Sequence, residues 1–227
     1  MNLFPLRILW VLCSAGMLVS CSQTSSENQT DQQSNAVPIT NVKSYLPLTK
    51  DFIWKFETAI NGRPYEDIAR VTGVKMFGSD RGVIIETTRG QILSLREAYQ
   101  FKDNTLLLVA FSTSRNQWVT LKPPIPIIRE NTPLGEELLW KGELQLNGKR
   151  LIAQGVSRTS AREPVQSRSA GRFTAIRVDT GITAELEQGD FVRYRTNRWL
   201  SPEVGFVKRE YLDQSNMRES QLISFKR

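Results

Sequence analysis

Two stretches of this chain read alike: residues 47–63 are PLTKDFIWKFETAINGR, and residues 133–149 are PLGEELLWKGELQLNGK. Apolar and polar residues alternate in both, so that Phe52, Trp54 and Phe56 would share one face of an extended strand. Each stretch contains Asn-Gly near its end. This pair fits a two-residue hairpin turn, because both central positions of a type I′ turn need a positive φ angle. Both stretches therefore predict β-hairpins.

The two stretches also match in register, at a constant separation of 86 residues. Seven pairs are identical, among them Trp54 with Trp140 and Gly62 with Gly148. A generic strand-and-turn pattern explains the alternation and the Asn-Gly pair, but hardly a shared Pro-Leu start and Trp-Lys-x-Glu in register as well. We interpret the match as an ancient duplication of a half-sheet unit, with half repeats of about 45–128 and 131–227.

Period-2 alternation and turn pairs continue through the rest of the chain, with hardly a helix signal. The pattern predicts roughly ten strands, which is too many for a flat sheet. We therefore expect an all-β fold in which a curved antiparallel sheet forms a half-barrel or a barrel. The Ser-, Arg- and Ala-rich segment from Arg158 to Gly171 is predicted to be the longest loop.

The N-terminal residues predict export. One cation, Arg7, precedes an apolar run over residues 8–19, a pattern typical of a signal peptide, here residues 1–20. The run is too short for a transmembrane helix, which needs about 20 apolar residues. Residues 22–42 are rich in Ser, Gln, Asn and Thr, so residues 21–42 are expected to be a disordered tether. The remaining residues, 43–227, are expected to form a single β domain.

The apolar run ends in Leu18-Val19-Ser20-Cys21, which resembles the lipobox of bacterial lipoproteins. The resemblance implies that Cys21 carries acyl chains such as palmitate and anchors the protein to a membrane outside the cytoplasm. Because Ser22 rather than Asp follows the Cys, the resemblance gives no signal for retention at an inner membrane. We expect the cell envelope, with the protein on the outer membrane facing the periplasm if the cell has one.

A broader resemblance involves both ends of the body. Tyr45-Leu46-Pro47-Leu48 leads to Trp54, and residues 199–208 read WLSPEVGFVK. This combination resembles a group of uncharacterised bacterial envelope lipoproteins with a Tyr-x-Pro-Leu start, a Trp, and a late Trp-x-x-Pro-x-Val-Gly-x-Val-Lys motif. The group is similar in outline to the lipoprotein-localisation carriers, whose curved open sheets hold acyl chains.

The composition excludes several chemistries. The chain has no His, and its two Cys residues are Cys13 and Cys21. The body therefore offers no Ser-His-Asp or Cys-His arrangement, and we expect no metal, cofactor or enzymatic activity. Carboxylate pairs leave a hydrolase as a third alternative, although solvated surface is the better interpretation of them. The pairs are Glu66 with Asp67, Glu136 with Glu137, and Glu185 with Glu187.

Two groups of residues are candidates for binding. Trp118 and Trp199 lie outside the repeated hairpins and could line an apolar groove on a curved sheet. Arg193, Arg195 and Arg198, in a chain of net charge +7, could form a basic surface toward anionic lipid or glycan. Alternatively, they belong to a solvated face whose cations pair with Glu and Asp across strands. The expected compartment argues against a nucleic-acid partner.

These observations favour a non-enzymatic, membrane-anchored envelope lipoprotein that binds an apolar ligand or a partner protein on its curved sheet. The alternative is a structural or assembly subunit of an envelope complex that uses a sheet edge for strand addition. A groove binder should keep an apolar concave face open to solvent. An assembly subunit should fill that face and expose an unpaired strand edge.

Overall fold

The predicted alternation produces strands along almost the whole body. The computed structural model describes residues 38–112, 117–146, 148–185, 191–213 and 216–227. Within them lie one short 3-10 helix and twelve strands: η1(Val42–Tyr45), β1(Ile53–Ile60), β2(Arg63–Phe77), β3(Asp80–Arg89), β4(Ile92–Lys102), β5(Thr105–Ser112), β6(Val119–Arg129), β7(Glu137–Leu146), β8(Lys149–Ser167), β9(Gly171–Glu185), β10(Phe191–Ser201), β11(Gly205–Asp213) and β12(Asn216–Lys226).

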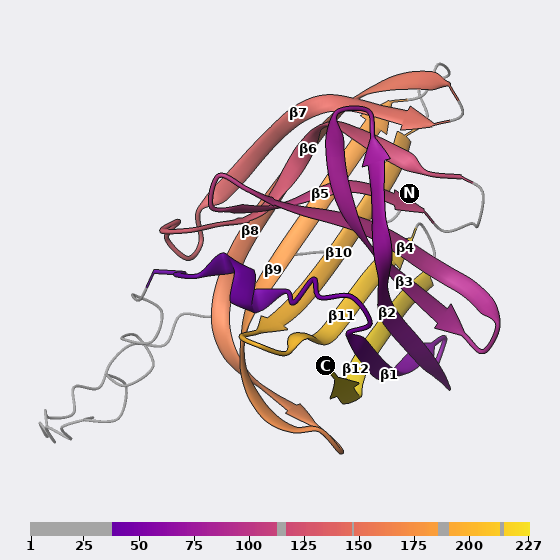
Figure 1. The fold of residues 1–227 in the computed structure, drawn as a ribbon, viewed down its shortest axis with the longest axis vertical. Coiled ribbons are helices and arrows are strands. Elements are labelled where there is room, and N and C mark those ends of the chain that lie inside the picture. Colours follow the sequence, from indigo (N-terminus) through magenta and orange to yellow (C-terminus); the bar gives the residue numbers. More distant parts are fainter. Residues whose placement is uncertain (1–37, 113–116, 147, 186–190, 214–215) are drawn as a thin grey trace, which may run out of the picture.

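The strands close into one antiparallel barrel (Figure 1). Each strand pairs with its neighbours in the chain, and β1 closes the barrel by pairing with β12. Closure removes the free edges that a curled sheet of this size would otherwise leave. The predicted all-β barrel is confirmed, with twelve strands instead of roughly ten.

The segment from Arg158 to Gly171 is not the predicted loop. It forms the second half of β8 and the turn into β9, and β8 pairs with β9 from Ala153 to Ser167. Small side chains explain the error, because Ser157, Thr159 and Ser167 are buried at positions where the prediction looked for apolar residues. A strand that carries hydroxyl groups toward a partly polar interior has a weak apolar pattern.

The two similar hairpins occupy opposite places in the barrel. In the strand order β1 and β7 lie six places apart in either direction, with β7 and β8 at the upper left of Figure 1 and β1 and β2 at the lower right. Asn61, Gly62 and Gly148 have the positive φ angles that the Asn-Gly turns predict, whereas Asn147 lies outside the described residues. Trp54 and Trp140 are both buried in the same core.

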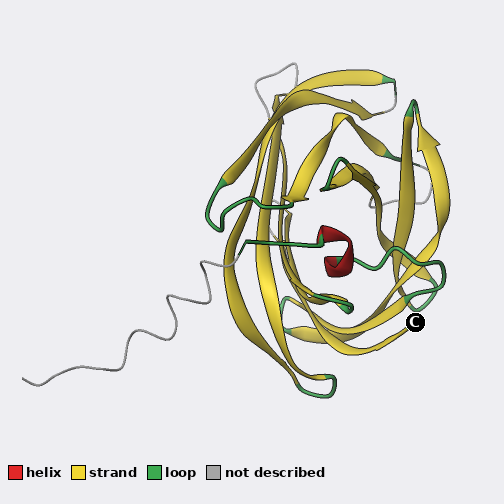
Figure 2. Cartoon of the chain, turned by 60° about the vertical axis from the view of Figure 1, so that its left-hand side comes forward, coloured by secondary structure: helices red, strands yellow, loops and turns green. Residues whose placement is uncertain are grey.

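One end of the barrel is closed by the residues before β1. In Figure 2 the red η1 helix lies within the surrounding strands. Two hydrogen bonds hold this segment, from Asn131 N to Ile39 O (2.9 Å) and from Glu203 N to Ser44 O (2.8 Å). Ile39 and Val42 are buried, so the folded body begins earlier than the expected boundary at residue 43. The residues that close this end, 38–48, are called the plug below.

The barrel has one weakly paired seam, between β6 and β7. These strands pair only from Thr120 to Lys122, where the sequence continues Pro-Pro-Ile-Pro. Proline cannot donate to a strand ladder, so the pairing cannot extend through this run. Trp140 closes part of the gap and donates its indole N–H to the carbonyl oxygen of Pro123 (2.8 Å).

Among the described residues, no helix has the length and apolar character needed to cross a membrane.

Candidate functional site

The inward faces of β10 and β11 carry charged and polar side chains. Along β10, Arg193 and Arg195 are exposed, whereas Thr196 and Arg198 are fully buried. Successive strand residues point to opposite faces, so Arg198 faces the barrel interior. Its neighbours across the strand pairs are Val178 on β9 and Arg209 on β11, both buried.

Arg198 forms a buried ion pair with Glu97 of β4. The distance from Nη2 of Arg198 to Oε1 of Glu97 is 2.8 Å, and both side chains are at most 1% exposed. Two tyrosine hydroxyl groups donate to the same carboxylate at 3.2 Å, Tyr194 to Oε1 and Tyr211 to Oε2. Arg198 also donates to the hydroxyl groups of Thr196 and Thr180. Glu97 of β4 is therefore surrounded by donors from two other strands, β10 and β11.

Electrostatics keep Glu97 ionised and the tyrosines neutral. Burial alone would raise the pKa of Glu97, but the positive charges of Arg198 and Arg209 hold that pKa below its ordinary value. Burial, together with the Glu97 charge, raises the pKa of Tyr194 well above its ordinary value and the pKa of Tyr211 to about 12. The tyrosine hydroxyl groups therefore remain donors to the carboxylate.

Arg209 is a second buried guanidinium, 1% exposed. It lies 4.2 Å from the ring centroid of Phe56 and 5.1 Å from that of Phe206. Within the described residues its guanidinium makes one hydrogen bond, to the hydroxyl of Thr87 (3.4 Å), and its Nε has no partner. No described carboxylate lies within ion-pair distance of this guanidinium, although its charge helps to lower the pKa of Glu97.

Arg218 of β12 faces the same interior. It pairs across the strands with the inward-facing Tyr211, and it is half-buried. Burial lowers its pKa, and the nearby charges that act on it include Asp67 and Arg89. Asp67 is already engaged by Arg89 through two hydrogen bonds of 2.9 and 3.0 Å.

The interior around these groups has an excess of positive charge. Four arginines, Arg89, Arg198, Arg209 and Arg218, face two carboxylates, Asp67 and Glu97. These six side chains, with Tyr194 and Tyr211, are called the polar cluster below. They come from strands β2, β3, β4, β10, β11 and β12, which are consecutive in the barrel apart from β1 between β2 and β12.

The wall opposite the polar cluster is apolar. Phe111 of β5 stacks on Tyr194 with ring centroids 4.3 Å apart, and the neighbouring inward residues belong to the core. They are Val119, Leu121, Leu144, Ile182 and Ala184. Tyr194, Tyr211, Arg218 and Val119 are only half-buried, so solvent reaches this part of the barrel. The arrangement combines an apolar wall with a cationic one, which suits a molecule that has both characters.

Neither candidate tryptophan belongs to the polar cluster: Trp118 packs against a separate small cluster, and Trp199 belongs to the main core. Trp118 packs on Phe77 (centroids 4.9 Å apart) and under the guanidinium of Arg96 (4.4 Å). Trp199 is buried between Lys208 (4.6 Å) and Arg177 (5.3 Å), two cations on the outward face of the barrel. The structure does not bring either residue to the polar cluster, and their role as ligand contacts stays a prediction.

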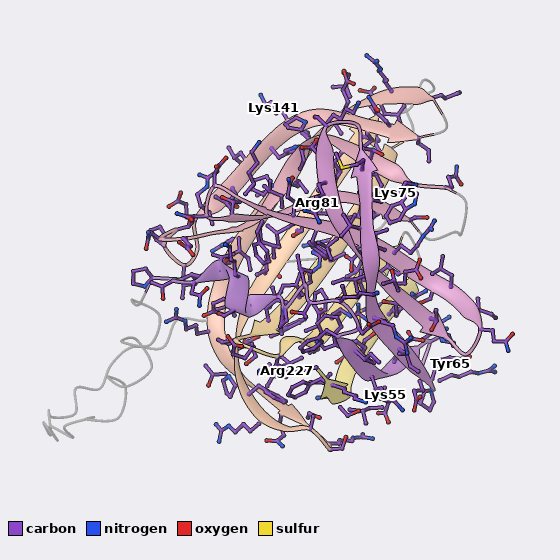
Figure 3. All side chains as sticks on the ribbon, in the orientation of Figure 1. Lys55, Tyr65, Lys75, Arg81, Lys141 and Arg227 are labelled. Atoms are coloured by element: carbon purple, nitrogen blue, oxygen red, sulfur yellow. The ribbon has the colours of Figure 1, made fainter. Side chains whose placement is uncertain are left out.

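The predicted basic surface needs one correction. Arg193 and Arg195 are exposed on β10, as expected, but Arg198 is fully buried and paired with Glu97. The odd-numbered residues 193 and 195 face outward, and an even-numbered residue on the same strand must face the interior. Exposed cations are spread widely over the outside, as Lys141 near the top and Lys55 and Arg227 near the bottom of Figure 3 show.

The paired carboxylates are mostly surface groups. Glu136, Glu137 and Glu185 are exposed, and Glu187 lies outside the described residues. The exception is Asp67, which is 1% exposed and paired with Arg89. The sequence analysis named Asp67 and Arg198 but assigned both to the surface, and it did not predict the polar cluster that they join. Strand parity was the signal that could have placed Arg198 inside.

A second concave region lies on the outside, at the seam between β6 and β7. Its volume is about 530 Å³, and it is lined by the seam prolines, Leu107 and Trp140. Two cations, Lys102 and Arg129, and two carboxylates, Asp80 and Asp103, also line it. These formal charges balance, in contrast to those of the polar cluster.

Comparisons with known proteins show the fold alone. No protein family and no curated protein matches the sequence. A predicted lipoprotein from Parabacteroides distasonis has a crystal structure similar to this chain, with TM-score 0.51, 14% identity and coverage of 80% of this chain and 98% of that one. A predicted exported protein from Bacteroides fragilis, described as having a YmcC-like fold, also has a similar crystal structure. Its TM-score is 0.51 at 12% identity, and the match covers 81% of this chain and 99% of that one.

Proposed function

We propose that this protein is an exported, lipid-anchored envelope lipoprotein, non-enzymatic, whose barrel interior binds an amphiphilic ligand. The observation that carries the binding function is the pairing of a cationic wall with an apolar wall in one solvent-accessible interior. Twelve strands also enclose more volume than the eight whose side chains fill a small barrel. The plug covers one end of the barrel, so a ligand would enter from the other.

Two observations support the cellular setting. The leader and the Leu-Val-Ser-Cys sequence before residue 22 are typical of a lipoprotein precursor, although Cys21 lies outside the described residues. The proteins that share the fold are described as a lipoprotein and an exported protein. A lipid anchor would hold the barrel near a membrane, where amphiphiles are abundant.

Native mass spectrometry tests the binding function. The full chain, purified in maltoside micelles, is titrated with palmitate, and bound ligand is counted from the mass of the released protein. We expect one palmitate per chain, with occupancy that saturates. A ladder of adducts that grows linearly with concentration, or no adduct at all, would refute the proposal.

The seam favours a second candidate function. Because β6 and β7 pair over only three residues, part of each strand keeps its backbone groups free for a partner strand. An assembly subunit would use this seam, which is the largest interruption of pairing in the described barrel. Co-purification of a protein that is lost when Leu139, exposed on β7, is replaced by Pro would favour assembly over ligand binding.

A further inference from the structure

The buried guanidinium of Arg209 has no hydrogen-bonded anion among the described residues. A charge out of water is costly unless it is paired and hydrogen-bonded. Three aromatic rings and one hydroxyl surround Arg209, and its Nε has no hydrogen-bond partner within the described residues. Aromatic faces stabilise a cation only modestly. The group is therefore stabilised less completely than Arg198, which has a carboxylate.

Neither nearby carboxylate forms a hydrogen bond or an ion pair with Arg209, although the charges of Arg209 and Glu97 attract each other. Glu97 already accepts hydrogen bonds from Arg198, Tyr194 and Tyr211. Asp67 is held by Arg89 through both carboxylate oxygens. The second cation of this region, Arg218, has no hydrogen bond or ion pair from its guanidinium to a described side chain, and burial lowers its pKa.

The cross-strand geometry places these two cations on one wall. Arg209 and Tyr211 alternate inward along β11, and Arg218 is the residue opposite Tyr211 on β12. Arg209 itself pairs with Ser220, two residues along the same face of β12. Side chains at such diagonal positions lie within reach of one ligand group.

We propose that Arg209 and Arg218 form the head-group site for an amphiphile with one anionic group, a carboxylate or a phosphate, and an acyl chain. This inference rests on the proposed function and names its ligand class. The anion would complete the coordination of both guanidinium groups, and charge-assisted hydrogen bonds to an anion are the strong ones. The chain would lie toward Phe111 and Ile182 on the apolar wall.

The test compares ligands that differ only in the head group. Full-length protein in maltoside micelles is titrated by native mass spectrometry with palmitate, hexadecyl phosphate and hexadecanol. We expect each anionic ligand to bind at least about tenfold more tightly than the alcohol, the factor that one charge-assisted hydrogen bond supplies. The ratio between palmitate and hexadecyl phosphate then distinguishes a carboxylate source from a phosphate source.

Two variants and a matched control test whether the preference for anionic ligands over hexadecanol depends on Arg209 and Arg218. Arg218→Gln alters a half-buried group and should reduce the preference for the anion to less than about threefold, with Arg209→Gln acting in the same direction. Arg195→Gln removes an exposed arginine from the outer face of β10 and should leave the preference unchanged. Circular dichroism of each variant shows whether it is folded, and the wild-type comparison stands without the variants.

The outcomes separate this inference from the function on which it rests. Equal affinity for hexadecanol and both anions would overturn the head-group site and leave a binding barrel. A preference that survives in both folded Arg variants would also overturn it. Failure of all three ligands to bind would overturn the proposed function as well.

Discussion

At the scale of single residues, the interior depends on the ion pair between Arg198 and Glu97. Both groups are at most 1% exposed, so neither can recover its hydration if the other is lost. Removing one partner of a buried pair leaves an uncompensated charge, which costs more than the pair itself contributes. Replacing either member of this pair should therefore lower the free energy of unfolding.

Glu97→Gln should therefore lower the free energy of unfolding by about 3–5 kcal/mol. Glu57→Gln is the matched control, because Glu57 pairs with Arg168 on the surface, and it should cost less than about 1 kcal/mol. Urea denaturation followed by tryptophan fluorescence measures both. Equal losses for the two variants would contradict the buried-pair account.

The low pKa of Glu97 predicts that the stability of the fold decreases at acidic pH. The pKa of Glu97 lies below its ordinary value of 4.5 in the folded protein, so its ionised form stabilises the fold above pH 4.5. That contribution is lost as the pH falls from 4.5 through the folded pKa. Wild-type stability should fall more steeply below pH 4.5 than that of Glu97→Gln, and parallel curves would show that Glu97 is not held ionised.

The raised pKa values of the interior tyrosines predict that the stability of the fold decreases at alkaline pH. Burial raises the pKa of Tyr99, Tyr194 and Tyr211 above the ordinary value of 10, in Tyr211 to about 12. Their neutral forms stabilise the fold below pH 10, and this contribution is lost as the pH rises from 10 through the folded pKa values. Tyrosinate absorbance should show Tyr99, Tyr194 and Tyr211 ionising at a pH above the ordinary value of 10. Ionisation of these three tyrosines near pH 10 with an unchanged circular dichroism spectrum would refute this.

At the scale of elements, the plug joins the N-terminal residues to the core. Leu46 is fully buried and packs in the same core as Trp54 and Phe206. The hydrogen bonds of the plug reach the turns after β6 and β10. The plug therefore links turns that are far apart in the sequence.

Leu46→Ala should lower the free energy of unfolding by about 2–5 kcal/mol, because a buried Leu leaves a cavity when truncated. Leu139→Ala, at a side chain that is 75% exposed, should change stability by less than about 0.5 kcal/mol. Guanidinium denaturation of the full-length variants gives both values. A small effect of Leu46→Ala would mean that the plug is not part of the cooperative fold.

The sequence predicted the elements better than the interior. Alternation and Asn-Gly turns predicted the hairpins, and the barrel followed from the number of strands. The duplication stays a prediction, with β1 and β7 at opposite places in the barrel. Phe56 and Gly142 are one of the pairs at which the two stretches differ. The structure explains why this position of the second stretch is a glycine. A Cβ on Gly142 would lie 2.6 Å from the Trp140 ring and 2.4 Å from the Lys122 carbonyl oxygen. These two neighbours leave room only for glycine.

The polar cluster was missed because its members are far apart in the sequence. Glu97 and Arg198 are separated by 101 residues, and no local pattern joins a Glu on one strand to an Arg six strands later. Hydroxyl-bearing residues such as Thr196 and Ser157 also weakened the apolar periodicity. Parity along β10 could place Arg198 inside, but only the closed barrel shows which charge it meets.

At the scale of the whole molecule, the proposed lipid anchor on Cys21 would hold the barrel at a membrane. Cys21→Ser should abolish lipid attachment, because only the thiol can accept the lipid at this position. The variant should be released from membranes or accumulate as an unprocessed precursor in fractionation and immunoblotting. Detection of the variant as a mature protein in the detergent phase would contradict the lipoprotein proposal.

On our proposal, an amphiphile binds in the interior of the barrel and not on its outer surface. The most direct measurement is a crystal structure of the protein with 16-bromohexadecanoic acid, in which anomalous scattering locates the bromine. We expect the bromine within the barrel beside Phe111 and the carboxylate at Arg209 and Arg218. A bromine peak in the outer region lined by Trp140 and the seam prolines, with the interior unoccupied by ligand, would contradict the account.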